Sequence, residues 1–110
     1  MSEGSYVLDR QGARALVRVV GDVDFSTRSR FEDVLTQAAT SPSLVISFLD
    51  CTFCDSSIIG ALVNLRESKP DRDVLLLVAP KTAVERVFGL VGIDRVFRIA
   101  PSEEGLAAGS

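Results

Sequence analysis

Runs of apolar residues divide this chain into short strands that alternate with amphipathic helices. Residues 44–49 and 74–79 are almost continuously apolar, which is typical of strands buried on both faces of a sheet. Upstream, residues 6–8 and 13–20 are rich in β-branched side chains and flank a Gln-Gly turn. They predict an antiparallel hairpin, and we expect Gly21 to end its second strand.

Three other segments carry apolar residues at helical spacing. The first follows Ser26 or Thr27, either of which can cap it, and ends before Pro42. The second begins near Ser56, and the third ends at Gly92 in a left-handed conformation. The apolar stripes are Phe31, Val34, Leu35, Ala38 and Ala39 in the first, Ile58, Ile59, Leu62, Val63 and Leu65 in the second, and Val84, Val87, Phe88 and Val91 in the third.

The order of elements predicts the fold class. A half-exposed strand at residues 95–99 and a last turn of helix at 102–104 complete the order β-β-α-β-α-β-α-β-α. Alternating strands and helices favour an α/β fold with a mixed, mainly parallel sheet and flanking helices. The length fits one domain over residues 1–110, with its core at about 6–99 and a short C-terminal helix or tail at 101–110.

The net charge and the absence of histidine exclude several classes of function for this chain. Twelve basic and fifteen acidic side chains give a net charge of −3, and no basic run is present, which argues against a nucleic-acid partner. The chain has no histidine, which excludes histidine general bases, Ser-His-Asp triads and histidine-containing metal sites. Few catalytic solutions therefore survive, and we expect neither a cofactor nor a metal.

The chain shows no pattern of a secreted or membrane protein. Its first six residues lack the basic and apolar regions of a signal peptide. The longest apolar stretch, residues 74–80, falls far short of the ~18–20 residues of a membrane span. Two cysteines make no disulfide framework, so we expect a cytoplasmic protein with no direct membrane insertion.

Cys51 and Cys54 form a C-x-x-C motif that has more than one interpretation. The pair resembles a redox dithiol or half of a zinc site. Zinc needs four ligands, and the chain has no further Cys and no His. A thiol in the first turn of the following helix would have its pKa lowered by the helix dipole, but neither cysteine lies there, which weakens the redox interpretation. The pattern favours two small buried residues at a strand end, with a thiol oxidoreductase as an alternative.

The start of the second helix, Asp55-Ser56-Ser57, also has two interpretations. Asp and Ser commonly cap helices. The same residues would present a hydroxyl at a helix N-terminus beyond a central parallel strand, where α/β sheets place their sites and where a phosphate is tolerated. Ile58 and Ile59 follow; successive residues cannot face the same side, so either one is exposed to a partner or both are buried between neighbouring elements.

Three stretches resemble, in order, the motifs of one known family. Residues 21–27 (GDVDFST) are similar to G-E-[LIV]-D-x-x-[ST], although alone their two carboxylates would fit a solvated loop. Residues 53–60 (FCDSSIIG) are similar to F-x-D-S-[ST]-G-[LI]-[GA], and residues 84–94 to a third helix with a Gly-Ile exit. Over residues 6–99 the chain resembles the STAS family (sulfate transporter and anti-sigma factor antagonist), especially bacterial single-domain anti-sigma factor antagonists.

The resemblance implies a phosphorylation-controlled switch that is not an enzyme. Ser56, with Ser57 as the alternative, would be phosphorylated by an anti-sigma factor that is a serine kinase. The unphosphorylated protein would sequester that kinase and free a sigma factor, and a phosphatase would reset the switch. Asp24 and Asp55 would flank the acceptor, and Thr27 would cap the first helix near the contact surface. The residues expected at the partner contact are Asp24, Thr27, Asp55, Ser57 and Ile58.

Two departures from the family pattern leave an alternative open. Asp22 replaces a Glu, which is a mild change, and Ile58 replaces the Gly beside the acceptor, where a β-branched side chain would affect access. Ile58 favours a STAS-type regulatory subunit of a membrane transport assembly, which would contact an ATPase and need no phosphorylation. The retained Asp-Ser-Ser sequence favours the antagonist.

Overall fold

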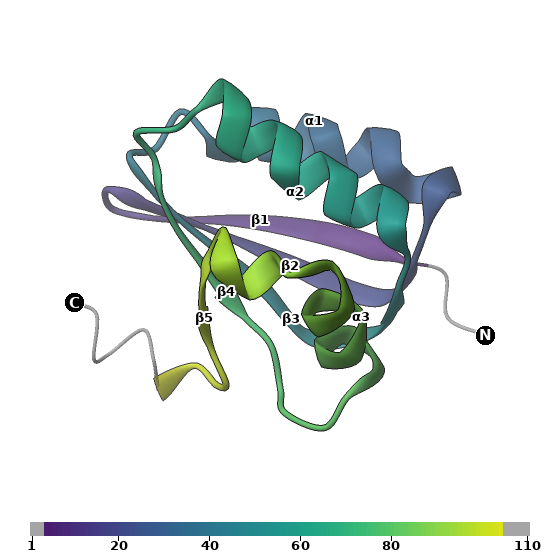
Figure 1. Ribbon diagram of the computed structural model, residues 1–110. Helices are drawn as coiled ribbons and strands as arrows, with labels where there is room; N and C mark the ends of the chain where they lie inside the picture. Colours follow the sequence, from purple (N-terminus) through teal and green to yellow (C-terminus); the bar gives the residue numbers. More distant parts are fainter. Residues whose placement is uncertain (1–3, 105–110) are drawn as a thin grey trace.

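The computed structural model describes residues 4–104, which form a five-stranded sheet whose strand order follows the chain (Figure 1). Strand β1 is antiparallel to β2, and β2 to β5 are parallel to one another. The mixed, mainly parallel sheet predicted from the sequence is confirmed. The elements are β1 (Ser5–Gln11), β2 (Arg14–Val23), η1 (Phe25–Thr27), α1 (Arg28–Ala38), β3 (Ser43–Cys54), α2 (Ser56–Ser68), β4 (Asp73–Leu77), α3 (Ala83–Val91), η2 (Ile93–Arg95) and β5 (Arg98–Ala100).

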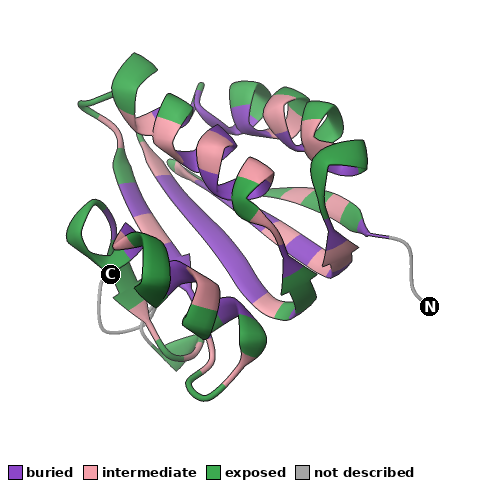
Figure 2. Cartoon of the chain, turned by 45° about the vertical axis from the view of Figure 1, so that its right-hand side comes forward, coloured by how far each residue is buried: buried purple, intermediate pink, exposed green. Residues whose placement is uncertain are grey.

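The main core lies between one face of the sheet and the three helices. Each parallel strand is added beside the previous one in the same direction, and right-handed crossovers then place every connecting helix on the same face. Alternate strand residues such as Ile46 and Leu76 accordingly share one buried cluster with Phe31 of α1, Leu62 of α2 and Val84 of α3. Figure 2 shows this buried layer along the central strand and the inner sides of the helices.

A chain of four aromatic rings crosses this core. Tyr6 of β1 stacks on Phe31 of α1 at a centroid distance of 5.0 Å, and Phe31 meets Phe48 of β3 edge-on at 6.5 Å. Phe48 then meets Phe88 of α3 edge-on at 5.0 Å. These rings tie the first strand to the last helix through the centre of the sheet, in geometries that favour aromatic pairs.

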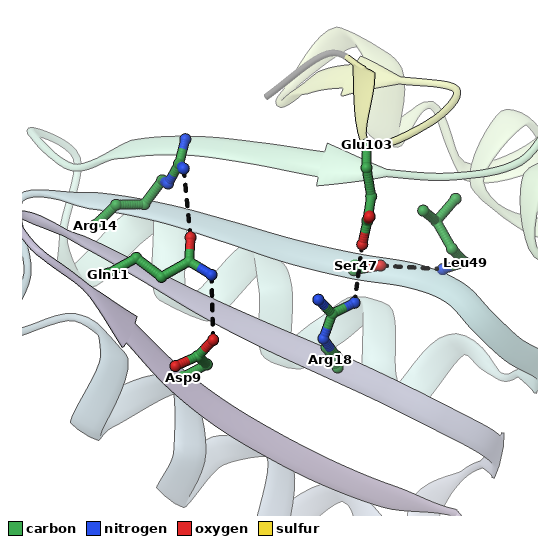
Figure 3. Close-up of polar contacts among 7 residues, drawn as sticks. All are labelled: Asp9, Gln11, Arg14, Arg18, Ser47, Leu49 and Glu103. Carbon is green, nitrogen blue, oxygen red and sulfur yellow. Dashed lines mark hydrogen bonds and ion pairs between the residues drawn. The ribbon is translucent and has the colours of Figure 1, made fainter. Parts of the chain in front are cut away.

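The opposite face of the sheet has a smaller apolar cluster and a surface network of polar side chains (Figure 3). Arg14 donates to Gln11, which donates to Asp9, along the edge of this face. Nearer the C-terminus, Glu103 forms an ion pair of 2.9 Å with Arg18. Both side chains are exposed, so this pair stabilises the fold only slightly. The buried members of the cluster are Leu16, Val45 and Leu77.

Three strands are longer than the sequence pattern predicts: β1 extends beyond residues 6–8, and β2 and β3 continue past β-bulges that shift their register. Strand β2 continues through Gly21, whose φ of 76° accompanies a shift in the pairing, and ends at Val23. The expectation that Gly21 ends the strand is therefore wrong. Strand β3 runs on past Leu49 to Cys54, with Thr52 as an extra residue opposite the Gly21–Asp22 step.

The C-terminal part differs from the expectation more than the rest. The strand predicted at residues 95–99 is only three residues long and begins at Arg98, after the short helix η2. Gly92 ends α3 with a φ of 73°, as predicted. At the predicted last turn, the Ser102 hydroxyl accepts a hydrogen bond of 3.3 Å from the Glu104 amide, and residues 105–110 of the expected tail lie outside the described residues. Within residues 4–104, no helix combines the length and apolarity needed to span a bilayer.

Candidate functional site

Asp55 shapes the start of α2. Its backbone is extended, and its carboxylate accepts a hydrogen bond of 3.0 Å from the amide of Ser57, which satisfies a free donor of the first helical turn. The Ser57 hydroxyl also donates to the same oxygen, Oδ1. The Ser57 hydroxyl is therefore held in the helix cap, and the residue is half-buried.

Ser56 differs from Ser57 in both exposure and bonding. It is the first residue of α2 and is exposed to solvent. Within residues 4–104 its hydroxyl has no hydrogen-bond partner. The helix thus presents one free serine hydroxyl at its N-terminus, beyond the C-terminal end of central strand β3. This hydroxyl is accessible to another protein.

The loop between β2 and α1 is closed by a reciprocal cap between Asp24 and Thr27. Asp24 accepts a hydrogen bond of 2.9 Å from the Ser26 amide, and its own amide donates to the Thr27 hydroxyl at 3.1 Å. Thr27 is only 4% exposed and also hydrogen-bonds the Tyr6 hydroxyl at 2.9 Å. Thr27 makes no side-chain cap of α1, so its expected capping role near a contact surface is wrong. Asp24 is exposed and is the capping residue.

A hydrogen bond joins this loop to the start of α2. The Phe25 amide donates to Oδ2 of Asp55 at 3.2 Å. Strands β2 and β3 are neighbours, so the two motifs singled out in the sequence meet at the same edge of the sheet. Partial burial acts to raise the pKa of Asp55, but hydrogen bonds from Ser57, Phe25 and Ile58 together hold it below its ordinary value. Asp55 is therefore a carboxylate at neutral pH.

Ile58 and Ile59 both point into the core, because α2 packs against the sheet on one side and against α1 on another. Ile58 has no exposed surface, so its expected place on the partner contact is wrong. It lies two residues beyond Ser56 and hence on another side of the helix. The β-branched side chain that replaces the family glycine therefore does not cover the Ser56 hydroxyl.

Two exposed aromatic rings border the site, and the sequence analysis did not single them out. Phe25 is 77% exposed next to the Asp55 contact, and Phe53 is 46% exposed two residues before Asp55. Large apolar side chains left in solvent are typical of surfaces that bind other proteins. Their position in the sequence could have indicated them, since each Phe lies within two residues of an aspartate predicted to flank the site.

Both cysteines lie near the C-terminal end of strand β3, and both are buried. The extra residue of the bulge brings both side chains to the core face. Burial raises the pKa of the Cys51 thiol to about 11 and that of Cys54 to about 12. A redox dithiol needs a lowered pKa, so these values oppose the oxidoreductase alternative. Residues 4–104 contain no cluster of three or more potential metal ligands.

Iodoacetamide should label the native protein at pH 8 roughly tenfold or more slowly than the urea-unfolded chain, because few native thiols are ionised at that pH. Labelling should accelerate as the pH approaches the raised value of about 11 for Cys51. Since only the native state holds its thiols protonated, its stability should fall over the same alkaline range. Mass spectrometry of quenched samples measures the rates. Equal rates for native and unfolded protein would contradict the assignment.

The fold and the site define a class of protein: a small α/β domain that presents a free serine hydroxyl at the N-terminus of a helix capped by an aspartate. The chain belongs to the STAS domain family, whose model matches residues 6–106.

Solved structures share this fold over nearly the whole chain. An anti-sigma factor antagonist from Mycobacterium paratuberculosis superposes with a TM-score of 0.86 at 22% identity, over 96% of this chain and 93% of that one. The anti-sigma factor antagonist SpoIIAA in its unphosphorylated form gives 0.67 at 18% identity, over 96% of both chains. The Bacillus cell fate determinant SpoIIAA in its phosphorylated form gives 0.66 at 18% identity, over 96% of this chain and 100% of that one.

Proposed function

We propose that this protein is an anti-sigma factor antagonist without enzyme activity, which binds an anti-sigma factor serine kinase and is released by phosphorylation of Ser56. The observation that carries the proposal is the exposed, unbonded hydroxyl of Ser56 at the start of α2. The family and its structural neighbours support the same role. Sequestering the kinase would free a sigma factor in the cytoplasm, and a phosphatase would restore the unphosphorylated form.

The proposed reaction uses Ser56 only as an acceptor. Its Oγ forms a bond to the γ-phosphorus of ATP while the bond to the β–γ bridging oxygen breaks, ADP leaves, and the hydroxyl proton passes to the kinase. The protein gains about −1.5 to −2 charges at neutral pH. The helix N-terminus tolerates this charge, so the domain stays folded.

The change in binding then follows from charge and bulk at the contact. Asp55 next to the acceptor and Asp24 in the loop that is hydrogen-bonded to Asp55 already give this edge of the sheet two carboxylates. A phosphate among them repels acidic groups of the partner and separates the surfaces around Phe25 and Phe53. No rearrangement of the fold is required.

Incubation with candidate anti-sigma factor kinases and ATP, followed by mass spectrometry of the peptides, should place one phosphate on Ser56. Ser56→Ala should abolish the modification, and Ser57→Ala should retain it, because the Ser57 hydroxyl is held by Asp55. Phosphate found on Ser57 in the unmutated protein would refute the assignment of the acceptor.

The transport-assembly alternative depended on Ile58 obstructing the acceptor. Because the Ile58 side chain is buried, that argument no longer favours it. Co-purification with transporter subunits in place of an anti-sigma factor is the result that would revive the alternative.

A further inference from the structure

Because Gly60 has no side chain, the side chain of Arg28 packs directly against this part of α2. A Cβ atom placed on Gly60 would lie 3.2 Å from Nη1 of Arg28 and 3.6 Å from its Cζ. The guanidinium of the first residue of α1 therefore rests directly on the neighbouring helix. Gly60 is one helical turn after Ser56, so both residues share one face of α2.

The contact at Gly60 places the guanidinium on the face of α2 that also carries Ser56. Side chains on a helix lean toward its N-terminus, so the surface that a residue at position 60 would cover lies over the preceding turn. That turn carries Ser56 and Ser57. Arg28 thus places a positive charge on the side of the helix where the free serine hydroxyl lies.

Arg28 has few stabilising contacts of its own in this position. Its Nε lies 3.4 Å from Glu32, in a partly exposed pair of the kind that contributes little. Its Nη1 and Nη2 make no hydrogen bond within residues 4–104. It also starts a helix, where the helix dipole disfavours a cation. The guanidinium therefore retains donors for an incoming anion.

We infer that Arg28 is the cation that receives the phosphoryl group on Ser56. The inference rests on the proposed function and adds the internal partner of the modified serine. Arginine binds phosphate through paired N–H donors, and a phosphate beside an arginine commonly forms such charge-assisted bonds. Asp55 and the carboxylate of Asp24 in the adjoining loop oppose a phosphate at this edge, Glu32 is the carboxylate already paired with Arg28, and Arg28 offsets the repulsion.

The test uses the full chain with phosphoserine incorporated genetically at position 56, so that no kinase is needed. A pH titration followed by 31P NMR measures the second pKa of the phosphate, which is about 6 in isolation. Arg28→Ala should raise that pKa by roughly 0.5 to 1 unit, since a neighbouring positive charge favours the dianion. Arg28→Lys should give an intermediate value, because it keeps the charge without the paired donors.

Two further variants separate a specific contact from a general effect of charge. Arg30→Ala removes the same charge two residues away, from a side chain whose charge acts on Tyr6, and should change the phosphate pKa much less than Arg28→Ala. Gly60→Ala adds a methyl group 3.2 Å from the present position of Nη1 of Arg28. Its Cβ should displace Arg28 and raise the phosphate pKa.

An unchanged phosphate pKa in Arg28→Ala, or equal shifts in Arg28→Ala and Arg30→Ala, would overturn the inference about Arg28. Neither result involves an anti-sigma factor or a kinase. Failure of the proposed function would instead appear as equal partner binding by the phosphorylated and unphosphorylated chains, so the two failures are distinguishable.

Discussion

Replacing Ser56 with glutamate is expected to weaken binding to the anti-sigma factor by roughly a hundredfold or more, whereas Ser56→Ala should bind like the unmutated protein. The serine is exposed and unbonded, so alanine removes no contact that holds the fold. Glutamate adds a negative charge next to the Asp55 cap, at the centre of the proposed contact, which also includes the carboxylate of Asp24. A loss of about 3 kcal/mol in binding free energy corresponds to this change.

Isothermal titration calorimetry with the purified anti-sigma factor measures both affinities, and ATP should release the unmutated protein but not Ser56→Ala. Ser68→Glu is the matched control, because it adds the same charge to an exposed serine at the other end of α2. It should bind normally. If Ser56→Ala and Ser56→Glu bind equally well, the switch model is wrong.

Phe48→Ala is expected to lower the free energy of unfolding by about 3 to 5 kcal/mol. Phe48 is buried in the central strand and contacts Phe31 on one side and Phe88 on the other. Removing the ring leaves a cavity between α1 and α3, which the surrounding structure fills only in part. The cost is a large fraction of the total stability of a domain of this size.

Urea unfolding followed by circular dichroism measures this cost. Phe48→Leu keeps most of the volume and should remain folded with a smaller loss, which protects the experiment if the alanine variant does not fold. Phe25→Ala removes the same ring from a site that is 77% exposed and should change stability by no more than about 0.5 kcal/mol. Similar losses for Phe48→Ala and Phe25→Ala would contradict the aromatic core described above.

The elements that the sequence predicted well are those specified by neighbouring residues. The apolar run at residues 44–49 is part of β3, residues 74–77 of the second predicted run lie in β4, and the stripe from Phe31 to Ala38 faces the core. Helix ends follow the same logic, because Asp55 and Gly92 act within one turn of their own positions. Periodicity and capping are short-range properties, and the sequence displays them directly.

The errors fall where residues far apart in the chain meet. Thr27 was expected at the surface but hydrogen-bonds Tyr6, which lies 21 residues away. The cysteines share the core face because a bulge adds a residue to β3. Ile58 is buried because α2 is enclosed by other elements, which its own pattern of apolar residues does not reveal.

By itself, the sequence determined the alternation of strands and helices, the fold class and the position of a serine at the N-terminus of α2. Only the tertiary structure decided the contacts between elements: it joined the two motifs through the Phe25 amide and Asp55, and it placed Arg28 of α1 on Gly60 of α2. The physical reason is range: strand and helix patterns depend on residues a few positions apart, whereas exposure, register and contacts between helices depend on how the whole chain packs.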